Sequence, residues 1–289
     1  MSNSRTVEAP AALLAFLFAA WPETKKKQVR TWLKFQAVMV NGRAITQFNH
    51  PLKPGDVVAI RSDRFAIPKT VLASGMKIYF EDASLIVIDK PENLLSIASE
   101  AEQEKTAYFQ LTAYLAGKPR GKERVWIVHR LDRETSGLMV FAKTPQAKEA
   151  LQGGWDKAVK RYEAVVEGKL PAAKGTLESD LDETNPFKVY VAPASEKTRH
   201  AVTHYRVLRW KNGRTLVELT LETGRRHQIR VQLAHMGCPI IGDKKYGSKS
   251  DPIRRLALHS CALKFPHPET GEEMAFESVL PKELDRLVG

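Results

Sequence analysis

The sequence predicts an α+β protein of two domains. A small α/β module is expected over residues 10–64, and a larger domain with a mixed, largely antiparallel sheet over residues 76–289. Strand-like segments recur through the larger part, helices fall between them at irregular intervals, and no β-α-β rhythm repeats. The 289 residues are enough for one large or two unequal domains, and 43% hydrophobic residues is typical of a folded protein.

The charge is unevenly distributed along the chain. Residues 1–64 hold 10 Lys and Arg against 4 Asp and Glu, whereas residues 65–289 hold 35 against 29, so each part contributes half of the net charge of +12. Such a surplus favours a polyanionic partner: RNA, DNA or an acidic membrane surface. Cys238 and Cys261 are too few for a zinc site made of cysteines and fit a reducing compartment, so we expect a cytoplasmic protein.

The first predicted element is a helix over residues 11–21, AALLAFLFAAW. This run is as apolar as the core of a signal peptide but too short to span a bilayer. Leu13, Leu17 and Trp21 recur at helical spacing, and no small-residue cleavage site follows. A packed helix is therefore favoured over a secretory signal.

A second helix is predicted over residues 25–35, with Thr24 as its possible cap. Val29, Trp32 and Leu33 share one arc of the helical wheel and can pack against the first helix. The opposite arc is basic and can face a phosphate backbone. It consists of Lys26, Lys27, Arg30 and Lys34.

Short strands complete the small domain. AVMVNGRAI (37–45) predicts two strands around an Asn41-Gly42 turn, and PLKPGD (51–56) predicts a turn into the strand VVAIR (57–61). Two helices followed by VNG and a PGD turn resemble the S4-type RNA-binding domain, which is named after a small-subunit ribosomal protein. A solvated basic helix on an unrelated small α/β module is the alternative.

Residues 65–75 are expected to link this module to the larger domain. That domain opens with KIYFEDASLIVIDKP (77–91), which predicts two strands around an acidic turn. Further strands are expected at residues 124–128, 137–142, 162–166, 203–209 and 215–221, and helices at residues 108–116, 146–152 and 228–236.

The segment HRLDRETSG (129–137) concentrates ionisable groups between two apolar strands, a position where rigid scaffolds carry functional side chains. Arg130 and Arg133 flank Asp132, and nearby cations favour a carboxylate, so we expect Asp132 to stay ionised. Such a group can act as a nucleophile or a base. A surface cluster of salt bridges explains the spacing equally well.

Three motifs in this order resemble the RluA-type family of RNA pseudouridine synthases. HRLDRETSGLMVFAKT (129–144) matches the family signature, KRYEAVVEG (160–168) its second motif, and ETGRRHQIRVQLAHMGCPIIGDKKYG (222–247) its third. LALHSCAL (256–263) is similar to the apolar segment that completes the family's pocket. These motifs cover most of residues 76–265, which makes the resemblance specific. It implies a pseudouridine synthase catalytic domain after the S4-like one.

The resemblance assigns roles to three residues. Asp132, the aspartate of HRLD, is implied as the catalytic residue, Tyr162 as the residue that packs against the target base, and Arg230 as the partner of the catalytic carboxylate. The reaction breaks the bond from ribose to a uracil nitrogen and joins the same sugar carbon to C5, without redox chemistry or hydrolysis. The family uses no cofactor, so we expect no cofactor and no metal. Asp132 could attack the sugar or the base, or take a proton from the sugar, and the sequence leaves these routes open.

RNA is the implied partner, and the added basic module favours ribosomal RNA over transfer RNA. A paired uridine must leave its helix to reach such a pocket, and Arg130 is implied to enter the vacated space. Ile229 and Leu258 are expected to line the pocket. The remaining residues expected to contact RNA are Arg133, Lys26, Lys27, Arg30, Lys34, Arg225 and Arg226. One chain supplies every motif, so we expect a monomer without membrane contact.

Two places depart from the family pattern. PENLLSI (91–97) replaces a proline-glycine-leucine run that ends in histidine-proline, and Arg226 stands where threonine is usual. Both are expected to alter substrate contacts while leaving the three matched catalytic positions in place.

Two other functions fit parts of the sequence. A non-catalytic RNA-binding ribosome-assembly factor would account for the charge and the S4-like module, but it has no need of the matched trio. A glycoside hydrolase acting on nucleosides would need a second carboxylate, for which Glu134 is the obvious candidate. His200 and His204 are four residues apart, but the segment alternates as a strand, so a metal site there is disfavoured.

Overall fold

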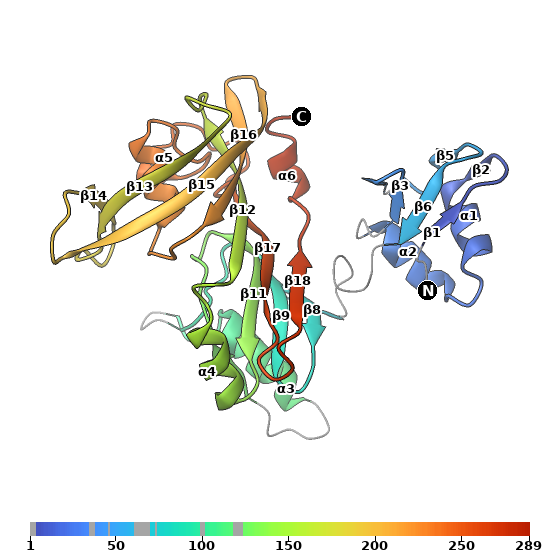
Figure 1. Ribbon diagram of the computed structural model, residues 1–289, viewed down its shortest axis with the longest axis horizontal. Coiled ribbons are helices and arrows are strands. Elements are labelled where there is room, and N and C mark those ends of the chain that lie inside the picture. Colours follow the sequence, from blue (N-terminus) through green and yellow to red (C-terminus); the bar gives the residue numbers. More distant parts are fainter. Residues whose placement is uncertain are drawn as a thin grey trace. The chain divides into compact units, whose positions relative to one another are not determined.

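A computed structural model describes residues 4–34, 38–45, 47–60, 70–72, 74–98, 102–117 and 124–289. The chain divides into two compact units, one of Met1–Val71 with Lys77–Phe80 and one of Leu72–Met76 with Glu81–Gly289. Both are drawn in Figure 1. Most of the predicted linker, 65–75, lies outside the described residues, so the predicted domain boundaries stay predictions.

The first unit combines two helices with short antiparallel strands. Its four-stranded sheet has the order β1-β6-β3-β4, and β2 pairs with β5. The pair β7 and β8 belongs largely to this unit. The elements are β1 (Ser4–Thr6), β2 (Ala11–Ala12), α1 (Leu13–Ala20), α2 (Lys26–Lys34), β3 (Val38–Val40), β4 (Arg43–Ala44), β5 (Pro51–Leu52), β6 (Val57–Ile60), β7 (Thr70–Val71) and β8 (Lys77–Glu81).

The helix predicted at residues 11–21 is present but begins later. Ala11 and Ala12 form β2 instead, because they pair with the Pro51–Leu52 strand. Leu13 and Leu17 of α1 are fully buried in the core of the unit. The apolar run is therefore a packed helix.

The amphipathic character predicted for the second helix is confirmed. Val29, Trp32 and Leu33 of α2 are buried in the same core as α1. Lys26 and Arg30 are exposed. The side chains of Lys27 and Lys34, and Phe35 as a whole, lie outside the described residues.

The Asn41-Gly42 turn joins β3 to β4 as predicted. Both residues have positive φ, 49° and 77°, a conformation that asparagine and glycine tolerate best. The Asn41 side chain donates to Asp56 Oδ1 at 2.8 Å and accepts from the Val57 amide at 2.9 Å. The turn therefore fixes the start of β6 as well.

The second unit is built on a mixed sheet with the order β14-β13-β15-β16-β12-β17-β11-β9, to which β10 and β18 add at β11 and β17. Among the strand pairs that the structure describes there, β11 and β17 run parallel and the others antiparallel, so the predicted α+β class is confirmed. The strands are β9 (Leu85–Lys90), β10 (Trp126–Ile127), β11 (Ser136–Ala142), β12 (Val159–Glu167), β13 (Lys174–Asp182), β14 (Tyr190–Ala192), β15 (Thr198–Lys211), β16 (Arg214–Leu221), β17 (Leu258–Pro266) and β18 (Glu273–Glu277).

The helices of this unit begin where side chains can cap them. Thr106 accepts from the Phe109 amide at the start of α3, and Thr144 accepts from the Ala147 amide at the start of α4. The helical segments are α3 (Ala107–Ala116), α4 (Pro145–Gly153), α5 (Gln228–His235), η1 (Lys244–Tyr246) and α6 (Lys282–Asp285). The three helices predicted from the sequence are α3, α4 and α5, each within one residue of its predicted ends. Within the described residues, no helix has both the length and the apolar character needed to cross a membrane.

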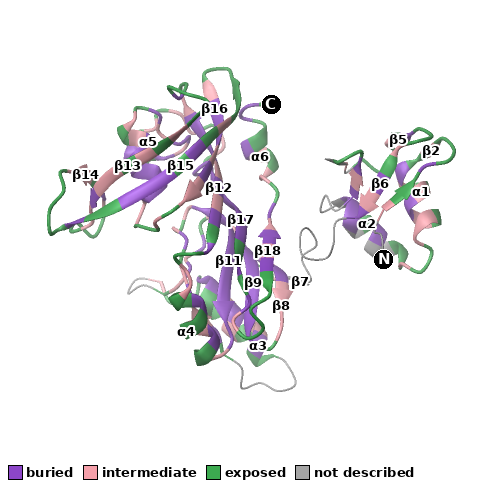
Figure 2. Cartoon of the chain, in the orientation of Figure 1, coloured by how far each residue is buried: buried purple, intermediate pink, exposed green. Residues whose placement is uncertain are grey.

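β17 occupies the middle of the sheet, between β12 and β11. Figure 2 shows β9 and β11 as buried strands, and every residue of both is buried. Gly137 in β11 has a φ of +116°, and a Cβ atom there would lie 2.3 Å from the carbonyl oxygen of Ser260 in β17. Only glycine permits this close approach, which places the loop before β11 directly beside β17.

Candidate active site

A buried lysine holds the loop between β10 and β11 in place. Lys90, which is fully buried at the end of β9, donates from Nζ to the carbonyl oxygens of Pro91, Leu94 and Arg133 at 3.0, 2.7 and 3.2 Å. Burial lowers the pKa of Lys90 to about 7, against the opposing charges of Asp132 and Glu134. The lysine therefore ties the loop to the segment that follows β9.

A second anchor comes from the segment in which the sequence departs from the family pattern. Ser96 Oγ donates to the Leu131 carbonyl at 2.7 Å and accepts from the Leu131 amide at 3.1 Å. Both groups are buried. The segment 91–97 thus holds both backbone groups of Leu131, the residue before Asp132, through Ser96.

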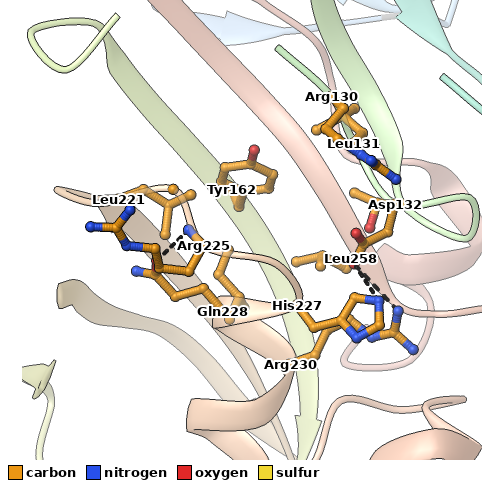
Figure 3. Close-up of a pocket in the computed structure, with 13 residues that line it drawn as sticks. Arg130, Leu131, Asp132, Tyr162, Leu221, Arg225, His227, Gln228, Arg230 and Leu258 are labelled. Atoms are coloured by element: carbon orange, nitrogen blue, oxygen red, sulfur yellow. Dashed lines mark hydrogen bonds and ion pairs between the residues drawn. The ribbon is translucent and has the colours of Figure 1, made fainter. Parts of the chain in front are cut away.

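Asp132 reaches from this loop towards α5. Its Oδ2 lies 3.3 Å from Arg230 Nη1 and 3.9 Å from His227 Nε2, and its side chain is 23% exposed. Glu134 Oε2 lies 3.5 Å from the same Nη1, with a side chain that is 41% exposed. Two carboxylates from one loop thus meet one guanidinium, as Figure 3 shows for Asp132.

The guanidinium of Arg230 is itself fixed by Asp243, just before η1. Nε and Nη2 donate to the two carboxylate oxygens of Asp243 at 2.7 and 2.9 Å, and both side chains are buried. Arg230 also lies over the Tyr246 ring, 5.4 Å from its centroid. Burial would lower the pKa of Arg230, but the hydrogen bonds and charge of Asp243, with Asp132 and Glu134, raise it. Arg230 is therefore a permanent cation aimed at Asp132.

Asp243 was not among the residues predicted for the site. It stands in GDKKYG at the end of the third motif, next to two lysines. Its side chain also accepts from the Tyr246 amide and so caps the start of η1. The third motif, 222–247, includes Asp243, so the family resemblance could have pointed to it. Nothing in the local sequence pattern marks Asp243 as buried.

Tyr162 stands on β12 with its ring in the pocket (Figure 3). It is 8% exposed. Burial, and after it the negative charge of Asp132, raises the pKa of Tyr162. The phenol therefore stays protonated: it can offer a ring face and a proton, but it cannot serve as a base near neutral pH.

Asp132, Tyr162 and Arg230 line one cavity of about 90 Å³. Among the predicted site residues, the cavity brings together Arg130, Asp132, Tyr162, Arg225, Ile229, Arg230 and Leu258. Arg130 and Arg225 are exposed, whereas Ile229 and Leu258 are buried. The cavity thus has an apolar floor, an ion pair and two cations within reach of solvent.

His227 also lines the cavity and was not predicted as a site residue. It precedes α5 with a φ of 53°, a left-handed conformation that costs a non-glycine residue energy and is often found at functional sites. Its Nδ1 lies 2.8 Å from the Tyr246 hydroxyl. Burial lowers the pKa of His227, and the charge of Asp132 opposes this effect.

Arg226 contacts a neighbouring loop of the same chain. Its guanidinium donates to the carbonyl oxygens of Glu183, Asn185 and Pro186, and its amide donates to Glu183 Oε1. It does not line the pocket. The arginine that replaces the usual threonine therefore holds the loop after β13.

The other predicted RNA contacts are placed elsewhere. Arg133 is exposed and outside the pocket lining. Lys26 and Arg30 are exposed on the first unit. His200 and His204 are exposed on β15, beside Asp180 and Glu222 respectively. Within the described ranges, no group of three or more His, Cys, Asp or Glu side chains is arranged to hold a metal ion.

Comparisons with known proteins agree on one family. Residues 84–235 match the family model of RNA pseudouridylate synthase. The Bacillus subtilis (strain 168) protein named uncharacterized RNA pseudouridine synthase YlyB is 36% identical over 285 residues, which cover 94% of this chain and 91% of that protein. Ribosomal large subunit pseudouridine synthase D of Vibrio cholerae is 33% identical over 279 residues, covering 90% and 84%. The solved structure of human RNA pseudouridylate synthase domain containing 4 has 27% identity and a TM-score of 0.61, and covers 72% of this chain and 90% of its own.

Proposed function

Because the chain belongs to the RNA pseudouridylate synthase family, we propose that Asp132 is the catalytic residue with which it isomerises uridine to pseudouridine in RNA. The enzyme is an isomerase, and RNA is its substrate. The observation that carries the proposal is the ion pair of Asp132 with Arg230, in a cavity that Tyr162 also lines. These three residues place a carboxylate, a guanidinium and an aromatic ring around one cavity.

The roles of the three residues follow from their surroundings. Arg230 orients Asp132 through their ion pair, and its own guanidinium is held in place by Asp243. Tyr162 offers its ring to the uracil and keeps its hydroxyl proton. In the reaction the bond from C1′ to N1 breaks, the bond from C1′ to C5 forms, and the hydrogen on C5 leaves as a proton while N1 gains one. Asp132 can start this sequence as a nucleophile or as a base.

We propose large-subunit ribosomal RNA as the substrate. Two observations support this choice: the named activity of the Vibrio cholerae relative, and a basic first unit with Lys26 and Arg30 exposed on α2. We propose that this unit is an S4-type module that docks on structured RNA. Action on ribosomal RNA fits a cytoplasmic enzyme. One chain carries all of the site residues, which fits a monomer.

Tritium release from RNA labelled at C5 of uracil tests the proposal, with unmodified ribosomal and transfer RNA as separate substrates. That hydrogen leaves only when the new carbon-carbon bond forms. Release by the parent protein and none by Asp132→Asn is the expected result, and it would also identify the RNA. Release by Asp132→Asn at the parent's rate would refute the assignment. RNA binding without release by the parent would instead favour a ribosome-assembly factor.

A further inference from the structure

A second cavity, of about 400 Å³, lies beside the pocket of Asp132. This volume falls within the roughly 300–1,000 Å³ typical of small-molecule sites. The two cavities share Arg130, Tyr162, Leu221, Gly224 and Arg225, so they adjoin one another at these residues. The remaining lining of the second cavity is His129, Trp155, Asp156, Lys160, Glu222 and Thr223.

Lys160 is an unusual residue for such a wall, because it is only 6% exposed. An ammonium group has three N–H donors. In the part of the chain that the structure describes, Nζ makes one hydrogen bond, to the Trp155 carbonyl at 3.1 Å. Burial lowers the pKa of Lys160, and the charge of Asp156 only partly opposes it. An anion entering the cavity would give this cation the partner that it lacks.

The cavity also has a flat, neutral wall. The Trp155 ring stacks on His129, with centroids 4.4 Å apart and planes inclined by 28°. His129 Nε2 accepts from the Val140 amide at 3.1 Å, and burial lowers its pKa to about 3, so the imidazole is uncharged. The tryptophan is thus held in one orientation by a rigid neighbour. Aromatic surfaces of this kind stack on nucleobases of any sequence.

The charges around the cavity favour a phosphate. Arg130 and Arg225 are exposed at the boundary with the first pocket, and Lys160 lies within the wall. These three cations exceed the two carboxylates of Asp156 and Glu222 by one. The combination of surplus positive charge and an aromatic wall matches the two parts of a nucleotide.

We propose that this cavity binds the nucleotide next to the target uridine on the same RNA strand. Its base lies against Trp155, and its phosphate lies near Lys160, with Arg130 and Arg225 on the side facing the uridine. The inference rests on the proposed function, because the first pocket must hold the uridine. The enzyme then grips two consecutive nucleotides, so the neighbour contributes to the choice of the target.

The experiment uses a short stem-loop from the RNA that tritium release identifies, chosen so that labelling its uridines one at a time shows which of them releases tritium. In two versions the neighbouring nucleotide on the 5′ or the 3′ side is abasic, and in a control version a more distant loop nucleotide is abasic. For the parent protein we expect one neighbouring abasic site to raise KM about tenfold, the usual effect of losing one stacked base, while the control leaves KM unchanged. This arm needs no protein variant.

A second arm tests the phosphate contact. Lys160→Met should raise KM about tenfold on the natural stem-loop and much less on one with a neutral methylphosphonate next to the uridine, because the charge contact is already lost there. Lys157→Met is the matched control, since Lys157 is exposed three residues before Lys160 and does not line the cavity. Lys160→Arg should restore most of the affinity. Circular dichroism checks that the variants fold.

The outcomes separate this inference from the proposed function. Normal tritium release with the same KM on every stem-loop would overturn the second subsite and leave the proposed function intact. Equal losses for Lys160→Met on the natural and methylphosphonate substrates would overturn the phosphate contact. Absence of release from every RNA would overturn the proposed function, and the subsite with it.

Discussion

Replacing Asp243 by Asn removes the charge that holds Arg230, at nearly constant side-chain volume. The carboxylate is 1% exposed and accepts from Nε and Nη2 of the guanidinium at 2.7 and 2.9 Å. Breaking a buried ion pair costs about 3–5 kcal/mol, because the remaining charge is left uncompensated. Asp132 and Glu134 stay near Nη1, so we expect the lower end, about 3 kcal/mol of unfolding free energy. For a unit of this size, the melting temperature should fall by about 6–12 °C.

Thermal unfolding followed by circular dichroism measures the stability, and single-turnover tritium release well below the melting temperature measures the chemistry. We expect a rate loss of about tenfold or more, because the guanidinium is free to turn away from Asp132. Glu134→Gln is the control: Glu134 contacts the same Nη1, but it is half exposed and should cost less than about 1 kcal/mol.

A double variant separates stability from catalysis. Arg230→Met with Asp243→Leu removes both members of the buried ion pair, so it should be more stable than Asp243→Asn alone and still inactive. A melting temperature and a rate equal to the parent's in Asp243→Asn would refute the reasoning, because Asp243 would then have no part in positioning Arg230.

Three further predictions concern other parts of the site. Because burial raises the pKa of Tyr162, Tyr162→Phe should lower the rate without changing the shape of its pH profile between about pH 6 and pH 9, and an altered alkaline limb would contradict this. Gly137→Ala should lower the unfolding free energy in urea by about 2–5 kcal/mol, because its Cβ would lie 2.3 Å from the Ser260 carbonyl oxygen at a φ of +116°. Gly153→Ala, with open space around it, should be neutral or slightly stabilising. The pKa of Lys90 is about 7 in the folded chain against 10.5 as the ordinary value, so the unfolded chain binds the extra proton between these values and stability should rise with pH across that window. Relative to Lys90→Met, the parent should gain about 2 kcal/mol between pH 7 and about pH 9, and equal pH profiles for the two proteins would exclude this role of burial.

Local patterns predicted much of the fold. Helical spacing located α2 and its buried face, and the Asn-Gly turn located the β3–β4 pair, because both depend on neighbouring residues. The start of α1 was wrong by two residues, because Ala11 and Ala12 pair with a strand about forty residues further on. β13 was not predicted either: its residues KGTLESDLD are mostly polar and half exposed, so they carry no apolar alternation.

In the site too, some residues were predicted from the sequence and others were recognised only in the folded chain. The resemblance pointed to Asp132 and Arg230, which lie 98 positions apart in the sequence and 3.3 Å apart in space. Asp243 and His227 were missed, because a carboxylate among lysines and a histidine among arginines look like surface residues until the chain is folded. The RNA contact predicted for Arg226 stays a prediction. The sequence did not indicate that its guanidinium binds three carbonyl oxygens of its own chain, because this contact depends on the loop after β13.

The central position of β17 determines when the enzyme can become active during its synthesis. This strand, Leu258–Pro266, separates β12, which carries Tyr162, from β11, which follows the Asp132 loop. The two halves of the pocket are therefore joined by a strand that is translated after both of them. A nascent chain that already contains Asp132, Tyr162 and Arg230 still lacks the strand that brings them into one sheet. Activity should thus appear only after residue 266 has been translated, and a truncation before residue 258 should remove the pocket rather than merely weaken it.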